Sequence, residues 1–349
     1  MNYRAVVFAL VAAVLFGIST PAAKVLLGSL DPAILAGLLY CGAGLGVAIL
    51  RRLIAPVIGA RAEAPLVRAD LPWLAGAVIF GGVLGPIFLM VGLARTEAAT
   101  ASLLLTLEGV STALLAWFVF HESFDRRIAL GMSCLVAGAI VLSWSGTPSL
   151  TGLVGPVAIV AACIAWGLDN NLTRKVSLAD PLQIVEIKGL VAGPINLLIG
   201  LLAGEMLPAM TSVVAAGIVG FLGYGVSLAL FVLALRDLGA ARTGAYFSTA
   251  PFIGAVAALV FLSEPVTPQL LAAGLLMAIG VWLHLTEVHE HDHAHESLEH
   301  VHAHVHDIHH RHAHGADDPP GEPHAHRHRH VRLRHRHSHV PDMHHTHRH

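Results

Sequence analysis

Ten apolar runs fill most of the first 285 residues of the chain, and each is about as long as a helix that crosses a lipid bilayer. Such a helix needs about 20 mostly apolar residues. Strands of membrane barrels alternate apolar and polar residues, and these runs do not. The sequence therefore predicts an all-α integral membrane protein with ten transmembrane helices, at Ala5–Leu27, Ala33–Leu50, Leu71–Leu93, Ala98–Phe118, Ile128–Trp144, Gly152–Leu172, Leu182–Gly204, Ser212–Leu233, Thr243–Leu262 and Gln269–Leu285.

The amino-acid composition excludes a soluble protein. The chain is 55% hydrophobic and 13% charged, whereas globular proteins have roughly 45–50% and 25%. Its net charge of −2 gives no basic excess of the kind that binds nucleic acid. The sequence contains no P-loop, dinucleotide-binding glycine motif or zinc-protease motif. We therefore expect no enzyme activity, no required cofactor and no ATP hydrolysis.

Lysine and arginine predict the orientation in the membrane, because cytoplasmic loops carry more of them than external loops. With the N-terminus in the cytoplasm, the outer side keeps only Arg95 and Lys24. An even number of helices then places the C-terminus in the cytoplasm as well. The eleven residues on the inner side are Arg4, Arg51, Arg52, Arg61, Arg68, Arg126, Arg127, Arg174, Lys175, Arg236 and Arg242.

The apolar part of the chain contains an internal repeat. Residues 114–122 and 256–264 are similar, both end in glutamate, and lie 142 residues apart. The same offset relates Ala98 to Ala240 and Ala99 to Ala241. Five helices per repeat is an odd number, so the two halves face opposite ways across the membrane. Inverted repeats of this kind are common in alternating-access transporters.

With these features the chain resembles the drug/metabolite transporter superfamily, in its EamA-type branch. The resemblance rests on the five-plus-five repeat, on the helix-ending Glu122 and Glu264, and on the Phe16-Gly17 pattern of the first helix. It implies two EamA-type repeats, at residues 1–145 and 146–285, in the inner (plasma) membrane. It also implies secondary transport of small metabolites, often as export.

The chain departs from the family pattern in helix 4. The family often places a proline in the middle of this helix, where the present chain has Leu107-Glu108-Gly109. Helix 9 keeps the proline as Pro251. The family also has no counterpart of residues 286–349, so the resemblance does not explain this tail.

Polar residues within the apolar runs are the candidates for a transport path, because they are costly in a membrane unless they are paired or hydrated. We expect Glu108, Asp169 and Asn170 to line a central cavity that holds a polar or cationic group or a coupling proton. The alternative is that these residues only fix helix packing. The full set of candidates is Glu108, Trp166, Asp169, Asn170, Asn171, Lys188 and Tyr246.

Other residues are interpreted as structural. We expect Glu122 and Glu264 to cap or anchor a loop, and Lys24 to anchor its helix at the headgroups. Glycines four residues apart predict close helix contacts and could also support a homodimer. They are the pairs Gly42/Gly46, Gly81/Gly85, Gly189/Gly193 and Gly200/Gly204.

The C-terminal 64 residues are hydrophilic and contain 23 of the 25 histidines. Most occur in His-x-His units, and in an extended chain residues i and i+2 point the same way, so two imidazoles can bind one ion. Imidazole suits Zn, Cu, Ni and Co. We predict a tail that is disordered without metal and binds divalent transition metal. Candidate ligands are His289, His291, His293, His295, His300, His302, His304, His306, His324, His326, His328 and His330.

Three functions are compatible with the sequence. The favoured one is a secondary exporter of a small metabolite, with lipid and a small-molecule or ion substrate as partners and a metal-binding accessory tail. The second is an exporter of Ni, Co, Zn or Cu whose tail collects the cargo. It is less favoured because the apolar part offers only His121 and Cys41, Cys134 and Cys163 as soft ligands before His284. The third is a membrane scaffold that does not transport.

Overall fold

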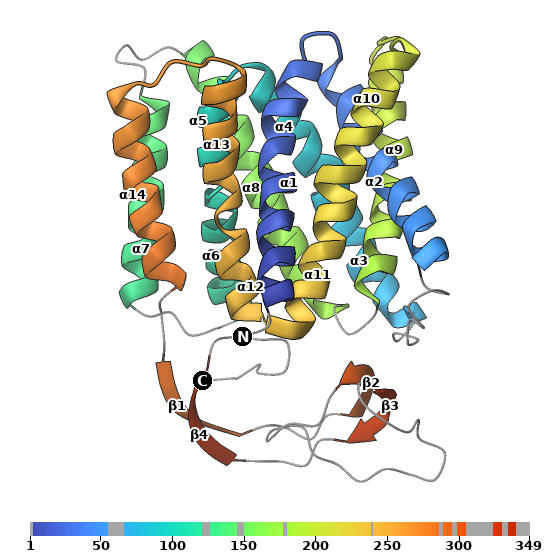
Figure 1. Ribbon diagram of the computed structural model, residues 1–349, viewed down its shortest axis with the longest axis vertical. Helices are drawn as coiled ribbons and strands as arrows, with labels where there is room; N and C mark the ends of the chain where they lie inside the picture. Colours follow the sequence, from blue (N-terminus) through green and yellow to red (C-terminus); the bar gives the residue numbers. More distant parts are fainter. Residues whose placement is uncertain are drawn as a thin grey trace.

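The apolar part of the chain forms one bundle of roughly parallel and antiparallel helices (Figure 1). The computed structural model describes residues 3–54, 66–120, 126–144, 150–176, 180–238, 240–285, 289–294, 299–304, 324–329 and 334–339. The helices are α1 (Tyr3–Leu26), α2 (Pro32–Ile54), η1 (Arg68–Asp70), α3 (Leu71–Ala77), η2 (Val78–Leu84), α4 (Gly85–Ala94), α5 (Ala98–Leu104), α6 (Leu107–Phe120), α7 (Arg126–Ser143), α8 (Leu150–Lys175), α9 (Pro181–Leu202), α10 (Met210–Gly220), η3 (Phe221–Val226), α11 (Ser227–Leu238), α12 (Ala240–Phe247), α13 (Ala250–Phe261) and α14 (Pro268–Leu285).

Each of the ten apolar runs is helical, which confirms the predicted all-α membrane fold. Among the described residues, eight helical segments are long and apolar enough to cross a membrane, and Ala250–Phe261 and Pro268–Leu283 are shorter apolar helices. The count of ten membrane-crossing helices thus stays a prediction. Large apolar side chains face outward along the bundle, with Ile140 59% and Leu275 65% exposed. Lipid accounts for such a surface, because soluble monomers rarely expose extended apolar areas.

Glycines allow the helices of the two halves to approach closely. A side chain on Gly42 would overlap the backbone at Gly217 of α10, and one on Gly189 of α9 would overlap Gly44 of α2. Gly193 packs in the same way against Cys41. The predicted close contacts are therefore made within a single chain. The homodimer that such pairs could support stays a prediction.

Two apolar runs are interrupted at equivalent positions of the repeat. The run predicted at Ala98–Phe118 divides into α5 and α6 at Leu105-Thr106, and the run at Thr243–Leu262 divides into α12 and α13 at Ser248-Thr249. Pro251 explains the second break, since proline is favoured in the first helical turn. The first break has no proline. There the Thr106 hydroxyl donates to the Leu103 carbonyl oxygen at 2.8 Å, a local bond that competes with the helical pattern.

Two further irregularities also occupy equivalent positions. The π-helical turns η2 and η3 interrupt the helices α3–α4 and α10–α11, and both contain two glycines. A π-helical turn shifts the backbone hydrogen bonds from i−4 to i−5, and such turns are frequent at functional sites. The repeat is therefore visible in the backbone as well as in the sequence.

An ion-pair group holds α2 and α9 together near the end of the bundle where α1 begins. Arg51 contacts Asp180 at 2.7 Å and Glu186 at 3.0 Å. Asp180 is also the N-cap of α9, where its carboxylate accepts from the backbone N–H of Leu182 at 2.9 Å. These contacts fix the start of α9 and hence the position of residues further along it.

The described part of the tail forms four short strands, β1 (His289–Ala294), β2 (Glu299–His304), β3 (His324–Arg329) and β4 (Arg334–His339). β1 pairs with β4 and β2 with β3, both antiparallel. The sequence predicted disorder, whereas the backbone of these four segments is extended and paired. In both strand pairs the register sets histidine opposite histidine, as for His291 and His337 or His302 and His326.

Candidate polar site in the bundle

The centre of the bundle contains a buried ion pair between α8 and α9. Lys188 Nζ lies 2.7 Å from Asp169 Oδ1 and 2.5 Å from Oδ2. Their side chains are 16% and 8% exposed. Asp169 Oδ1 also accepts a hydrogen bond from the Thr173 hydroxyl at 2.9 Å, one helical turn along α8. A pair this well hydrogen-bonded offsets the large cost of removing both charges from water.

The π-helical turn η2 lies directly against this pair. A β-carbon on Gly81 would overlap the Asp169 carboxylate, so only glycine fits there. The Gly81 carbonyl oxygen accepts from the Tyr40 hydroxyl at 2.7 Å and from Trp166 Nε1 at 3.0 Å. Asn196 Nδ2 donates to the next carbonyl oxygen, that of Gly82, at 2.9 Å. The turn thus brings side chains from α2, α8 and α9 to one place.

Glu108 forms a second polar group beside the first. It lies in the first turn of α6, where the helix dipole favours a negative charge. Asn170 Nδ2 donates to Glu108 Oε1 at 2.9 Å and to the Thr112 hydroxyl at 3.1 Å. Asn171 Nδ2 donates to the Thr112 carbonyl oxygen at 3.2 Å. Consecutive residues of α8 therefore connect Glu108 and Asp169.

Of the seven residues expected to form the path, six belong to these two adjoining groups. Tyr246 does not join them through its described contacts. It lies on α12, which packs against α1 and α11, and its carbonyl oxygen accepts from the Thr249 hydroxyl at 2.6 Å. Sequence reasoning missed Tyr40 and Asn196, which are lone polar residues in apolar runs of α2 and α9. It interpreted Gly81 only as a packing residue, although the double glycine was a signal.

Aromatic rings extend from the polar centre into the second half of the chain. The ring centroids of Tyr40 and of Tyr224 in η3 are 5.9 Å apart, and those of Tyr224 and of Phe16 in α1 are 5.7 Å apart. Phe16 in turn contacts Phe247 of α12 at 5.4 Å. The series links both repeats and ends at Phe247, the last residue of α12 before the break between α12 and α13.

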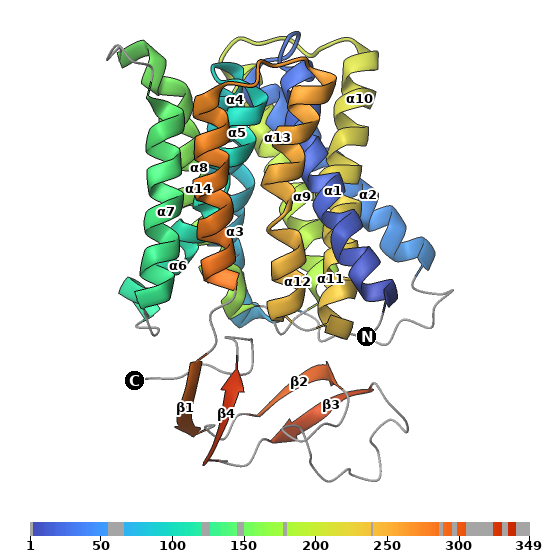
Figure 2. The ribbon, with the colours of Figure 1, turned by 60° about the vertical axis from the view of Figure 1, so that its left-hand side comes forward.

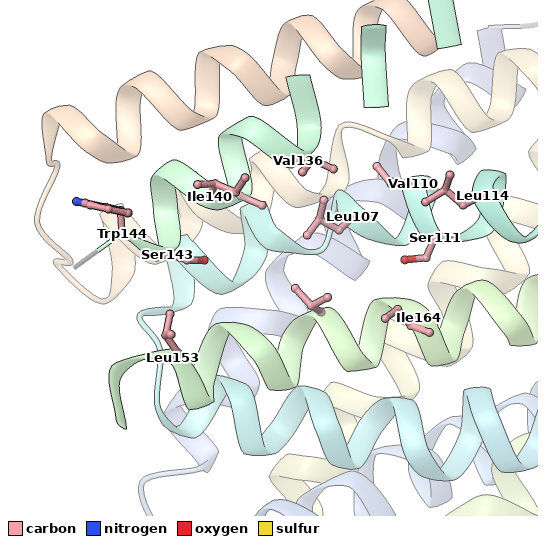
Figure 3. A pocket seen from close by; sticks show the side chains of 12 residues that line it. Leu107, Val110, Ser111, Leu114, Val136, Ile140, Ser143, Trp144, Leu153 and Ile164 are labelled. Atoms are coloured by element: carbon pink, nitrogen blue, oxygen red, sulfur yellow. The ribbon is translucent and has the colours of Figure 1, made fainter. Parts of the chain in front are cut away.

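A cavity of about 530 Å³ lies between α6, α7 and α8. Figure 3 shows its lining, in which Ser111 and Ser143 are polar among mostly aliphatic side chains such as Leu107, Val136 and Ile164. The charged residues of the centre do not line this cavity. Its chemistry fits a hydrocarbon environment and differs from that of the polar centre.

A metal centre is not formed by the side chains that the structure describes: no three His, Cys, Asp or Glu come together in a way that could hold an ion. Cys163 is buried, and its thiol donates to the Leu104 carbonyl oxygen at 3.6 Å. The histidine side chains of the tail, including His295, His306 and His330, lie outside the described part of the chain. Metal binding there stays a prediction.

A membrane bundle of two matching halves, with charged residues held at its centre, defines a class of membrane transporters. The model of the EamA-like transporter family matches residues 3–144 and again residues 153–286. The chain belongs to this family, and with it to the drug/metabolite transporter superfamily. It is a multi-pass membrane protein and a transporter of this type.

Individual relatives agree with this assignment. An uncharacterized transporter of Methanothermobacter thermautotrophicus is 30% identical over 291 residues, which cover 78% of this chain and 83% of the relative. A probable amino-acid metabolite efflux pump of Salmonella typhimurium is 25% identical over 208 residues, covering 54% and 67%. A crystal structure matches with a TM-score of 0.58 at 16% identity, covering 81% of this chain and 96% of that one, and shows the fold alone.

Proposed function

We propose that the protein is a secondary transporter that exports a small metabolite carrying a cationic group. The observation that carries the proposal is the charge of the polar centre. Glu108 and Asp169 contribute two negative charges and Lys188 one positive charge when all are ionised. One negative charge then lacks a counterion, and an unbalanced charge at this depth is costly. A substrate cation or a proton at Glu108 restores the balance.

The two carboxylates have different roles in this proposal. Asp169 is already paired with Lys188 and holds the centre together. Glu108 accepts a hydrogen bond from the Asn170 amide, which is neutral and therefore leaves the negative charge of Glu108 without a counterion. Asn170 is exposed while Asp169 is buried, so Glu108 lies on the more accessible side of the network. Glu108 is therefore the residue we assign to substrate or proton binding.

Export and an amino-bearing substrate agree with the name of the Salmonella relative, an amino-acid metabolite efflux pump. We further propose that the protein lies in the plasma membrane with both termini in the cytoplasm. The excess of lysine and arginine supports this orientation. In Figure 1 the start of α1 and the end of α14 lie at the same end of the bundle, as an even number of crossings requires.

Counterflow in proteoliposomes tests the transport proposal. Purified protein is reconstituted, vesicles are loaded with unlabelled amino acids, amines or acids, and uptake of the labelled compound is followed with and without a pH gradient. We expect exchange of at least one amine-bearing compound and none of simple dicarboxylates. A scaffold would exchange nothing in this panel, and exchange restricted to acids would contradict the role of Glu108.

We also propose that residues 286–349 bind divalent transition metal as an accessory to transport. The strand register supports this proposal, since it sets histidine opposite histidine in both strand pairs, as for His291 and His337 or His302 and His326. Deletion after Leu285 separates this from metal export. If the shortened protein still exchanges its organic substrate and only cellular metal tolerance changes, the tail is an accessory. If metal efflux from vesicles is observed and is lost with the tail, the protein is a metal exporter.

A further inference from the structure

One contact between the two halves lies at the end of the bundle opposite the start of α1, here called the distal end. Glu264 follows α13 and reaches the beginning of α5. Its Oε1 accepts from the backbone N–H of Ala98 at 2.6 Å and its Oε2 from that of Ala99 at 2.8 Å. One carboxylate therefore satisfies two N–H groups that a helix start leaves without a partner. The expectation that Glu264 caps a helix end is confirmed.

Lys24 holds the other side of the same turn. Its Nζ donates to the carbonyl oxygens of Leu93 at 2.6 Å and of Thr96 at 2.8 Å, at the end of α4. The expectation that Lys24 reaches the headgroups was wrong. The reason is that its ammonium lies beside carbonyl groups that the end of α4 leaves unsatisfied. A cation at a helix end and an anion at a helix start are both favoured by the helix dipoles.

These contacts fasten α1 and α13 to the turn between α4 and α5. Figure 1 and Figure 2 both show these four helices together at the distal end. Glu264 comes from the second repeat, whereas the α4–α5 turn comes from the first. We call Lys24, Glu264 and the turn at residues 93–99 the distal clamp. It is a hydrogen-bonded link across the two halves of the transporter.

The chain below the distal clamp is tightly packed. Ser102 of α5 is 1% exposed, and a β-carbon on Gly254 of α13 would lie 2.8 Å from its hydroxyl oxygen. A β-carbon on Gly17 of α1 would overlap the Ala250 carbonyl oxygen. α5 runs from the clamp toward Glu108, which lies ten residues beyond Ala98, or about 15 Å along helical segments. The polar centre is thus separated from the distal surface by the clamp and the packing below it.

We propose that the distal clamp is the gate between the polar centre and the distal side of the membrane, and that its two charged side chains hold it closed in the present structure. Opening requires Glu264 to leave α5 and Lys24 to leave α4, so that α13 and α1 separate from α5. Glu264 and Lys24 are gating residues and touch no substrate. The proposal rests on the transport function of the family, but its test does not depend on the substrate.

Accessibility of a single cysteine tests the gate. Ser102 is replaced by cysteine in a chain whose three native cysteines are alanine; its hydroxyl has no hydrogen-bond partner, so the exchange costs little. Sealed vesicles of both orientations are treated with a membrane-impermeant maleimide. We expect slow labelling with the intact clamp. Glu264→Gln or Lys24→Met should speed labelling about tenfold or more from one side only, because hydrogen bonds to charged groups are the strong ones.

Glu97→Gln is the matched control. Glu97 is the exposed N-cap residue of α5 and makes no side-chain cap bond, so Glu97→Gln removes a negative charge near Lys24 without breaking a hydrogen bond of the clamp. We expect it to leave labelling unchanged. Cys41 is half-buried and packs on Gly193 of α9. In a second chain that keeps Cys41 as its single cysteine, the labelling rate of Cys41 measures general loosening of the bundle.

Two results would overturn the gate. The first is labelling of the cysteine at position 102 that stays slow in both Glu264→Gln and Lys24→Met. The second is faster labelling of position 102 from both sides together with faster labelling of Cys41. This result would mean that the contacts of Glu264 and Lys24 only stabilise the fold. Counterflow measured on the same preparations distinguishes failure of the gate from failure of the proposed substrate class, since labelling can change whether or not the tested compounds are exchanged.

Discussion

Individual side chains in the polar centre differ in how strongly the fold depends on them. Asp169 is buried and accepts three described hydrogen bonds from Thr173 and Lys188, whereas Glu108 is half-buried and its carboxylate accepts one from the Asn170 amide. Both are carboxylates within apolar runs, and the sequence favoured a functional role for Glu108 only slightly more than for Asp169. From these contacts we expect Asp169 to matter mainly for stability and the charge of Glu108 to be available to a ligand.

Glu108→Gln should preserve the fold and reduce transport. Glutamine keeps the size of the side chain and an oxygen that accepts from Asn170, but it removes the charge. We expect normal membrane abundance and counterflow lowered about tenfold or more, equivalent to about 1.4 kcal/mol or more of lost interaction. Glu205→Gln, on an exposed distal loop, is the control. Unchanged counterflow in Glu108→Gln would return Glu108 to a packing role.

Asp169→Asn should instead destabilise the protein, because it leaves the Lys188 ammonium buried without its partner. Breaking a buried pair costs about 3–5 kcal/mol, whereas removing both charges can be nearly neutral. We expect low membrane abundance and a lower Tm in detergent for Asp169→Asn, with partial recovery in Asp169→Asn/Lys188→Met. The single variant Lys188→Met is measured as well. If the loss of Tm in the double variant equals the sum of the losses in the two single variants, this pairing is contradicted.

At the scale of secondary structure, the interrupted helices position the site more than the continuous ones do. The break before α6 places Glu108 in a first turn, and η2 turns the Gly81 carbonyl oxygen toward Tyr40 and Trp166. These irregularities depend on local hydrogen bonds and on close approach between helices. Both are tertiary effects that a hydropathy pattern does not contain.

Replacing glycines tests this dependence. Gly81→Ala should impair both stability and transport, because the added methyl group would overlap the Asp169 carboxylate against η2. Gly109→Ala is the matched control, since a β-carbon there meets no atom within 4 Å. Alanine is favoured over glycine within helices by about 1 kcal/mol, so the control should be neutral or slightly stabilised. Equal losses of Tm in the two variants would contradict the close contact.

The sequence predicted the helical runs and the repeat, and six of the residues that it singled out lie together in the polar centre, where their role in transport stays a prediction. It succeeded because apolar length and buried charge are strong signals that require no knowledge of neighbours. It failed for Lys24 and Asn196, whose partners lie far along the chain at Leu93 and Gly82. The same limit applied to Tyr40. A polar side chain at a helix end or in an apolar run does not itself reveal its acceptor.

At the scale of the whole molecule, the tail should respond to pH independently of the membrane bundle. Neutral imidazole is the metal ligand, and its unperturbed pKa is about 6.5. Protonation therefore competes with metal, and binding should weaken as the pH falls through this value. The tail charge would change from 7 − 10 = −3 to −3 + 23 = +20 on full protonation.

Equilibrium dialysis with Zn²⁺ or Ni²⁺ at pH 7.5 and 5.5 measures this effect on the full-length protein. We expect several ions per chain at the higher pH and a large loss at the lower pH. The protein shortened after Leu285 should bind little metal at either pH. Binding that is retained at pH 5.5 would indicate carboxylate rather than imidazole ligands.

The breaks in the two repeats have a consequence for stoichiometry. α6 and α13 both begin near the middle of the bundle and run toward opposite ends (Figure 1), so two helix starts with partial positive charge meet at one depth. The first turn of α6 carries Glu108, while the first turn of α13 contains no acidic residue. Of these two helix starts, related by the repeat, only that of α6 carries a carboxylate. If Glu108 binds the cation, each cycle should move one monovalent cation or exchange it for one proton.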